Sequence, residues 1–220
     1  MTIRELIRPL PGVRRVSLMR QRIAYGDSAR FWEANYAQGR TSGCGSYGRL
    51  AEGKGRYLND LVREYEVGSV IEFGCGDGNQ LSMAQYPAYI GLDVSRTAIA
   101  LCQRRFAADA TMSFFLYDGT CYTDRAGVFT ADLALSLDVV YHLTEDAVFE
   151  AYLRHLFAAA RRLVVIYSTD AVLGGTAPHV RHRHFSPWIE ANVPGWRLAR
   201  VTTGPSAERA RADFFLYTRS

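Results

Sequence analysis

Lysine is nearly absent from this chain of 220 residues: Lys54 is the only one, so arginine carries almost all of the positive charge. The arginines are scattered, and the net charge of +4 includes no basic block of the kind that marks nucleic-acid-binding arms. This distribution disfavours a nucleic-acid partner.

Long apolar runs are also absent. No stretch approaches the roughly 18 apolar residues of a transmembrane helix, so we expect no membrane span. Residues 1–22 are basic, and Pro9 and Pro11 interrupt them, so they lack the continuous apolar core of a signal peptide. The cysteines form no C-x-x-C pair, which indicates free thiols and a cytoplasmic protein.

The composition is that of an ordinary globular protein, with 48% hydrophobic and 22% charged residues. The length suits one sizeable core. We expect residues 1–48 to form an N-terminal arm and lid segment, and residues 49–220 to form the main domain. The glycine-rich loop 39–48, which contains Tyr47, is suited to a lid over a ligand.

The most informative stretch follows the apolar run Ser69–Phe73, which predicts a buried strand. Glycines then occupy three alternate positions, Gly74, Gly76 and Gly78, where they allow backbone to approach a ligand closely. We expect a helix from about Gln80 to Gln85, whose N-terminus would offer N–H groups to negative charge.

Strands and helices alternate along most of the chain, which predicts an α/β fold. Further strands are expected at 89–93, 112–117, 132–137 and 163–167, and the last two, 196–203 and 214–218, form a probable hairpin. Helices are expected at 28–38, 50–65, 95–107 and 145–160, with a short one from Ser186. Ser95, Thr144 and Ser186 are the expected N-caps.

Two ligand classes use a glycine loop between a strand and a helix. Dinucleotide enzymes require a third small residue where this chain has Asn79, so that fingerprint fails. The pattern E-x-G-C-G-x-G, which begins at Glu72, instead resembles motif I of class I S-adenosylmethionine-dependent methyltransferases. A second acid, Asp93, ends the next strand about 20 residues after the loop, as a βαβ unit requires.

The resemblance covers about Arg49 to Ser220 and implies a fold and a cofactor. The fold is a seven-stranded Rossmann-like sheet with its last strand antiparallel and helices on both faces. The cofactor is S-adenosylmethionine. The resemblance places Tyr47 over the cofactor as a lid, and it places Glu72, Gly74, Gly76 and Gly78 in the loop beside the cofactor. It places Asp93 at the ribose, and Asp118 and Gly119 at the adenine. Leu137 and Asp138 are placed at the methionine part. Asp77 either binds the cofactor's ammonium or caps the following helix.

Chemistry at the acceptor is expected after the fourth strand, where small-molecule methyltransferases often carry a histidine near the transferred methyl. A hydroxyl acceptor needs a base to take its proton, and His142 is the natural candidate. Tyr141 is expected to orient the acceptor. The alternative is that His142 is only a packed residue at the start of a helix.

A second cluster, residues 179–185, is rich in histidine and arginine. Arg181, His182 and His184 are the expected acceptor-binding residues, although a solvated loop is the alternative. Two of these histidines form H-x-H, a spacing that metal ligands use, together with Asp138 or Asp170. No complete metal motif is present, so no residue is assigned to a metal and a role for Mg²⁺ stays open.

The motifs together resemble bacterial methyltransferases that accompany saccharide biosynthesis. The resemblance implies O-methylation of a small acceptor, a sugar hydroxyl in glycan or polysaccharide biosynthesis. The alternatives are N-methylation of an amino sugar or other small amine, and a non-catalytic nucleotide-binding regulatory protein. A homodimer is left open.

Overall fold

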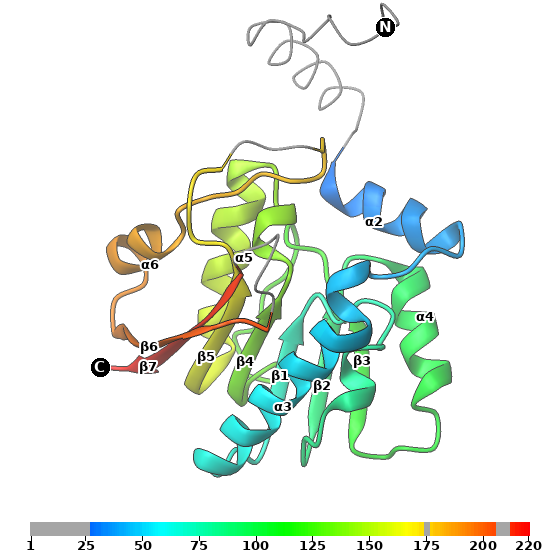
Figure 1. Ribbon diagram of the computed structural model, residues 1–220, viewed down its shortest axis with the longest axis horizontal. Helices are drawn as coiled ribbons and strands as arrows, with labels where there is room; N and C mark the ends of the chain where they lie inside the picture. Colours follow the sequence, from blue (N-terminus) through cyan, green and yellow to red (C-terminus); the bar gives the residue numbers. More distant parts are fainter. Residues whose placement is uncertain (1–26, 174–176, 206–211) are drawn as a thin grey trace, which may run out of the picture.

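The computed structural model describes residues 27–173, 177–205 and 212–220, so the predicted arm at 1–22 lies outside the described residues. Its core is one seven-stranded sheet of order β3-β2-β1-β4-β5-β7-β6 (Figure 1). The strands are β1 Val70–Phe73, β2 Tyr89–Asp93, β3 Met112–Leu116, β4 Ala131–Leu137, β5 Ala160–Ser168, β6 Trp196–Thr203 and β7 Asp213–Arg219. The helices are α2 Ser28–Ala37, α3 Gly48–Glu64, α4 Arg96–Arg105, α5 Asp146–Ala158 and α6 Ser186–Asn192, with the short 3₁₀ turns η2 Cys44–Ser46, η3 Leu81–Met83 and η4 Val140–His142.

The central strands are parallel and buried on both faces. All four residues of β1 are buried, and this strand pairs in parallel with β2 and β4. Such strands lack alternation because helices cover both faces. The final strand β7 pairs antiparallel with both β5 and β6. The predicted sheet, including its antiparallel last strand and its terminal hairpin, is therefore confirmed.

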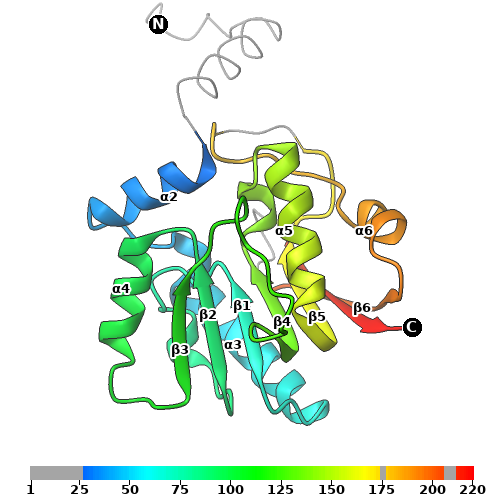
Figure 2. The same cartoon turned by 180° about the vertical axis from the view of Figure 1, so that it is seen from behind.

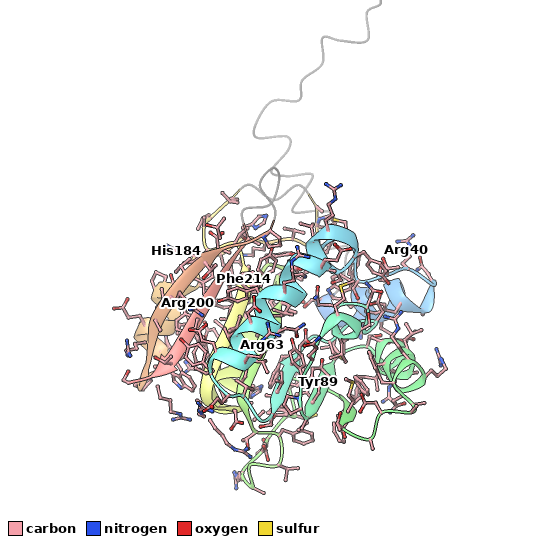
Figure 3. The ribbon with its side chains drawn as sticks, turned by 60° about the horizontal axis from the view of Figure 1, so that its bottom comes forward. Arg40, Arg63, Tyr89, His184, Arg200 and Phe214 are labelled. Carbon is pink, nitrogen blue, oxygen red and sulfur yellow. The ribbon has the colours of Figure 1, made fainter. Side chains whose placement is uncertain are left out.

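Two layers of helices enclose the sheet (Figures 1 and 2). Leu58 and Leu61 of α3 and Cys102 of α4 belong to one core cluster, together with alternate residues of the strands. Phe149 of α5 and Ile189 of α6 belong to a second cluster on the opposite face. Figure 3 looks onto α3, with Tyr89 of β2 and Phe214 of β7 labelled beside that helix. The predicted covering of both faces is thus confirmed.

Three helix starts test the predicted N-caps. The Ser95 hydroxyl accepts from Ala98 N–H (3.0 Å), as expected. Thr144 is not a cap, because α5 begins one residue later with Glu145 at the N-cap. Ser186 is also not a cap: it is the first residue of α6, and its hydroxyl bonds to Asp170 instead. In both errors the helix begins one residue later or earlier than predicted relative to the hydroxyl, which donates to a nearby carboxylate.

The expected helix at 80–85 is wrong. Only the 3₁₀ turn η3 forms there, and Ala84 is already extended. The Ser82 hydroxyl bonds back to the carbonyl of Asn79 (2.6 Å), and Asn59 of α3 holds the carbonyl of Met83 (3.0 Å). These local side-chain bonds compete with helix propagation, and Pro87 limits the remaining length. The glycine loop therefore lies beside a single turn and not at the end of an α-helix.

Parallel pairing brings the carboxyl ends of β1, β2, β3 and β4 to one edge of the sheet. Ligands in open α/β sheets bind outside this edge. Helix α2 lies beyond this edge and is joined to α3 by residues 38–47 (Figure 1). The segment 27–47 thus covers the place where a ligand is expected.

Candidate functional site

A cavity of about 790 Å³ opens at the carboxyl edge of the sheet, a size typical of small-molecule sites. Segment 27–47 contributes to its wall, and so do the ends of β1 to β4 and the start of α5. The predicted residues that line it are Glu72, Gly74, Gly76, Asp93, Asp118, Gly119, Leu137, Asp138 and His142. The predicted residues outside the lining are Tyr47, Asp77, Gly78, Tyr141, Arg181, His182 and His184.

The glycine loop needs its glycines for two reasons. Gly74, Gly76 and Gly78 have φ values of +88°, +57° and +74°, in the region that side chains disfavour. A Cβ on Gly74 would lie 2.5 Å from Val139 Cγ2, and one on Gly76 would lie 2.4 Å from Ser42 Oγ. The loop is therefore bare backbone pressed between its neighbours, the cradle that a close ligand requires.

Asp93 lies at the end of β2, beside this loop. Its Oδ2 accepts from Gly76 N–H (2.9 Å) and its Oδ1 from Ser95 N–H (2.8 Å). Burial raises the pKa of this carboxyl to about 6, while the two backbone donors act in the opposite direction. Because an ionised carboxylate has about four acceptor positions, two of them remain for the hydroxyls of a sugar. The geometry fits a ribose-binding acid.

Glu72 lies inside the cavity wall and is almost inaccessible, with 4% of its surface exposed. The Tyr89 hydroxyl donates to its Oε2 (2.7 Å). Burial raises the pKa of Glu72 to about 7, while Tyr89 and the charge of Lys54 lower it. Near neutral pH this carboxyl is therefore divided between its protonated and ionised forms.

The predicted helix cap at Asp77 is wrong, and its predicted role at the cofactor's ammonium stays a prediction, although its side chain lies outside the cavity lining. Its Oδ2 accepts from Ser42 N–H (2.9 Å) and from the Tyr47 hydroxyl (2.8 Å), and its Oδ1 accepts from Asn79 N–H (3.0 Å). No α-helix follows for it to cap. Asp77 ties the loop 38–47 to the glycine loop, and Ser42 and Ser46 of that loop line the cavity.

Helix α2 is fastened across the cavity by two further carboxylates. Glu33 accepts from the hydroxyls of Ser95 (2.6 Å) and Thr97 (2.7 Å) at the start of α4. Glu145, at the start of α5, accepts from the backbone and hydroxyl of Ser28 (2.9 and 2.7 Å). Two aromatic side chains of this helix, Trp32 and Tyr36, line the cavity.

Asp138 follows β4 in the left-handed region, with φ of +60°, a conformation that is uncommon for a residue with a side chain. Its Oδ2 accepts from Lys54 Nζ (2.5 Å) and its Oδ1 from the Tyr141 hydroxyl (2.8 Å). Lys54, the single lysine, is completely buried. Tyr141 therefore supports Asp138. It is not among the residues that line the cavity, and its role at the acceptor stays a prediction.

His142 lines the cavity next to Trp32, with ring centroids 4.9 Å apart. Its Nδ1 lies 2.8 Å from the carbonyl of His179, which can only accept, so Nδ1 carries the hydrogen. Nε2 then holds a lone pair in the neutral ring. Burial lowers the pKa of His142 to about 4, so the ring is neutral at physiological pH.

The adenine end of the predicted site is more open. Asp118, after β3, accepts from both the backbone (2.9 Å) and the hydroxyl (2.7 Å) of Thr120, which lower the pKa of its carboxyl. Gly119 lies beside it in the lining, with half-exposed apolar side chains of Leu116 and Val148 nearby in the wall. This end offers apolar surface together with backbone and carboxylate acceptors.

The histidine- and arginine-rich loop does not reach the cavity. Arg181 Nη1 lies 3.0 Å from Asp146 and donates to the carbonyl of Thr144 (2.8 Å), which fastens the loop to α5. His182 Nδ1 lies 2.6 Å from the hydroxyl of Thr169, and His184 lies 3.6 Å from Asp170. His184 is labelled on the opposite side of the molecule from Arg40 of the loop 38–47 (Figure 3). Their role in acceptor binding stays a prediction.

The sequence reasoning missed two residues here. Lys54 was noted only for its rarity, and Gln80 only as part of a helix. Gln80 lines the cavity directly after the glycine loop, and its buried Oε1 has no hydrogen-bond partner among the described residues. A buried amide oxygen without a donor is unfavourable for folding. The cavity's donor and acceptor set fits S-adenosylmethionine.

Two searches concern other classes of site. The described ranges contain no group of three histidine, cysteine, aspartate or glutamate side chains arranged to hold a metal ion. In the same parts of the chain, no helix is both long enough and apolar enough to cross a membrane.

Comparisons with known proteins agree with this site. Residues 70–162 match the family model described as a methyltransferase domain. A curated relative, the small RNA 2′-O-methyltransferase of Arabidopsis thaliana, is 24% identical over an alignment of 163 residues, and the match covers 67% of this chain and 17% of the relative. The chain therefore spans less than a fifth of that protein.

Solved structures share the fold. The methyltransferase domain of bacterial CtHen1 superimposes with a TM-score of 0.62 at 19% identity, covering 77% of this chain and 98% of that one. S-adenosylmethionine-bound CalS10, an amino pentose methyltransferase from Micromonospora echinaspora, has a TM-score of 0.61 at 15% identity, with 79% and 93% covered. Because one relative acts on small RNA, the predicted exclusion of nucleic acid is not confirmed.

The predicted family and cofactor are those of the proteins that this chain resembles. The glycine loop, the acid after β2 and the sheet order agree with the matched domain. Residues 70–162 match a methyltransferase domain, and the sheet has the fold of solved S-adenosylmethionine-dependent methyltransferases.

Proposed function

We propose that this chain transfers a methyl group from S-adenosylmethionine to a hydroxyl of a small acceptor, with a saccharide as the acceptor class. The observation that carries the proposal is the cavity bounded by the glycine loop, Asp93 and His142. The cofactor supplies a methyl carbon on a sulfonium: the acceptor oxygen bonds to that carbon, the carbon–sulfur bond breaks, and S-adenosylhomocysteine leaves with the electron pair.

The chain's own residues would hold the cofactor along the strand ends. Asp93 would accept from the ribose hydroxyls, and Asp118 with Gly119 would meet the adenine. Leu137 and Asp138 would border the methionine part. The lid loop, fastened through Asp77, would exclude water, which favours alignment of the reacting atoms.

His142 is the candidate base. Its Nδ1–H is engaged by the His179 carbonyl, which leaves Nε2 to accept the proton of the acceptor hydroxyl as the new bond forms. Since the pKa of His142 is lowered to about 4, the ring stays neutral through the physiological range. Turnover should then show no loss from protonation of His142 as the pH falls from 8 to 6.

Replacing the base tests this role. His142→Ala should lower kcat at least about 100-fold and leave the Kd for S-adenosylhomocysteine nearly unchanged. His155→Ala, which alters a half-buried histidine of α5 outside the cavity lining, is the matched control and should retain turnover. A loss of less than about threefold in His142→Ala would remove His142 from the role of base.

An amine acceptor is the second candidate, because CalS10 is named as an amino pentose methyltransferase. A neutral amine needs less help from a base, so its methylation should tolerate His142→Ala better than that of a hydroxyl. A panel of hydroxyl sugars, amino sugars and a short RNA with a free ribose 2′-hydroxyl, assayed with labelled cofactor, would separate these acceptors. Turnover of the amino sugars alone would replace the hydroxyl proposal.

A further inference from the structure

One large aromatic side chain at the cavity has no role in the mechanism described above. Trp32 of α2 lines the cavity and is only partly buried, whereas Tyr36, one turn later, is 5% exposed. The indole N–H of Trp32 donates to none of the described residues, and it is not one of their enclosed polar atoms. Both the apolar ring and its N–H donor are therefore available at the cavity wall.

Trp32 lies directly beside the candidate base. Its ring meets the ring of His142 edge to face, with centroids 4.9 Å apart and an interplanar angle of 78°. Helix α2 is held in place on either side of this contact, by Ser28 bonded to Glu145 and by Glu33 bonded to the start of α4. A molecule that packs against the cavity side of Trp32 therefore lies next to His142.

The order of the strands separates this end of the cavity from the cofactor end. Asp93 and Asp118 follow β2 and β3, which lie on one side of β1, whereas His142 follows β4 on the other side. A cofactor that extends from Asp118 across Asp93 to the glycine loop leaves the β4 end unfilled. Trp32 and His142 thus border the space that remains for the acceptor.

The wall at this end suits a molecule that has an apolar face and a polar rim. Leu143 and Trp32 supply apolar surface, and Ser28 and Glu145 supply polar groups. A sugar ring has this character, because its C–H groups form a face and its hydroxyls form the rim. Among the described residues of the lining, the only arginine or lysine is Arg96, which follows the cofactor end, so a phosphate would find no cation beside the base.

We propose that Trp32 positions the acceptor, by packing its indole against the face of an unphosphorylated sugar ring. The inference rests on the proposed function, since it assumes that the acceptor lies beside His142. The contact fixes the tilt of the sugar ring, so that one hydroxyl faces His142 Nε2 and the other hydroxyls stay at the polar rim. Such alignment of the reacting atoms favours transfer.

Fluorescence tests this contact directly. The chain has three tryptophans, and the other two, Trp188 and Trp196, lie outside the cavity lining. With S-adenosylhomocysteine at saturation, the methyl glycosides of glucose, galactose, mannose and rhamnose are titrated in turn. At least one should change the emission of the wild type and of Trp188→Phe, the matched control, but not that of Trp32→Phe. Glucose 6-phosphate should bind at least about 10-fold more weakly than methyl glucoside.

Affinity and turnover separate acceptor binding from simple support of His142. For the glycoside that gives the signal, Trp32→Leu should weaken binding at least about 10-fold by calorimetry and raise KM in parallel. It should leave kcat within about threefold of wild type and the Kd for S-adenosylhomocysteine within about twofold. Trp32→Phe keeps an aromatic ring and should recover most of the lost affinity.

Several results would overturn the inference. These are no change in Trp32 emission with any glycoside, a fall in kcat without a change in KM, or a loss of S-adenosylhomocysteine affinity as large as the loss for the glycoside. Methylation of a glycoside without any Trp32 signal would remove the inference and leave the proposed function intact. If the wild type binds no S-adenosylhomocysteine, the proposed function itself fails.

Discussion

Replacing Glu72 by glutamine should change how the stability of the protein depends on pH. The carboxyl has an ordinary pKa of 4.5, and burial raises it to about 7 in the folded chain. At about 1.4 kcal/mol for each pKa unit, this difference corresponds to about 3 kcal/mol. Glutamine keeps an oxygen for the Tyr89 hydroxyl but cannot ionise.

The sign follows from where the proton is held more tightly. Below pH 4.5 both the folded and unfolded chains keep the Glu72 proton, so its full stabilisation is present. As the pH rises through about 7, the unfolded chain has already ionised, and the folded chain must do so at a buried site. Stability due to Glu72 is therefore lost with rising pH.

Urea unfolding of wild type and Glu72→Gln from pH 4.5 to 8 measures this effect. The free energy of unfolding of the wild type minus that of the variant should fall by about 3 kcal/mol over this range. Taking the difference cancels other titrating groups, including His142, which would otherwise destabilise the fold as the pH falls from 6.5 toward about 4. The exposed Glu150→Gln is the control and should give a flat difference. A flat curve for Glu72→Gln would refute the argument from burial.

Two further changes address the loop and its lid. Gly76→Ala should weaken binding of S-adenosylhomocysteine at least about 10-fold by calorimetry, because a Cβ would lie 2.4 Å from Ser42 Oγ at a φ of +57°. Gly39→Ala, at φ +72° with open space around it, should leave binding intact, and equal losses in both variants would point to backbone strain alone. Tyr47→Phe removes the hydroxyl that donates to Asp77 (2.8 Å), which should lower stability by about 1 kcal/mol and speed dissociation of the ligand in stopped-flow experiments. An unchanged dissociation rate would mean that this contact does not hold the lid over the ligand.

The sheet could be predicted because its signals are local. The sequence predicts in order a strand at Val70–Phe73, a loop at the three glycines and an acid at Asp93. Parallel pairing then brings the ends of the strands together. The helix at 80–85 was wrong because local side-chain bonds, which periodicity does not register, compete with helix formation.

The interior of the site could not be predicted in the same way. The ion pair joins Lys54 and Asp138, which are 84 residues apart, and no sequence pattern in either segment predicts it. Gln80 Nε2 donates to the carbonyl of Ala51 in α3, and Gln80 Oε1 has no hydrogen-bond partner among the described residues. Arginine is chemically suited to an acceptor, which is why Arg181 is predicted there; its ion pair with Asp146 of α5 could not be predicted from the sequence.

The most direct test is calorimetric titration of S-adenosylhomocysteine into the wild type and Asp93→Asn, with NAD⁺ as the comparison ligand. Asparagine retains one acceptor oxygen, so it can satisfy only part of what Asp93 now does for Gly76, Ser95 and the ribose. The account predicts saturable binding to the wild type, binding at least about 10-fold weaker to the variant, and no binding of NAD⁺. Absence of binding to the wild type, or equal affinity in Asp93→Asn, would contradict it.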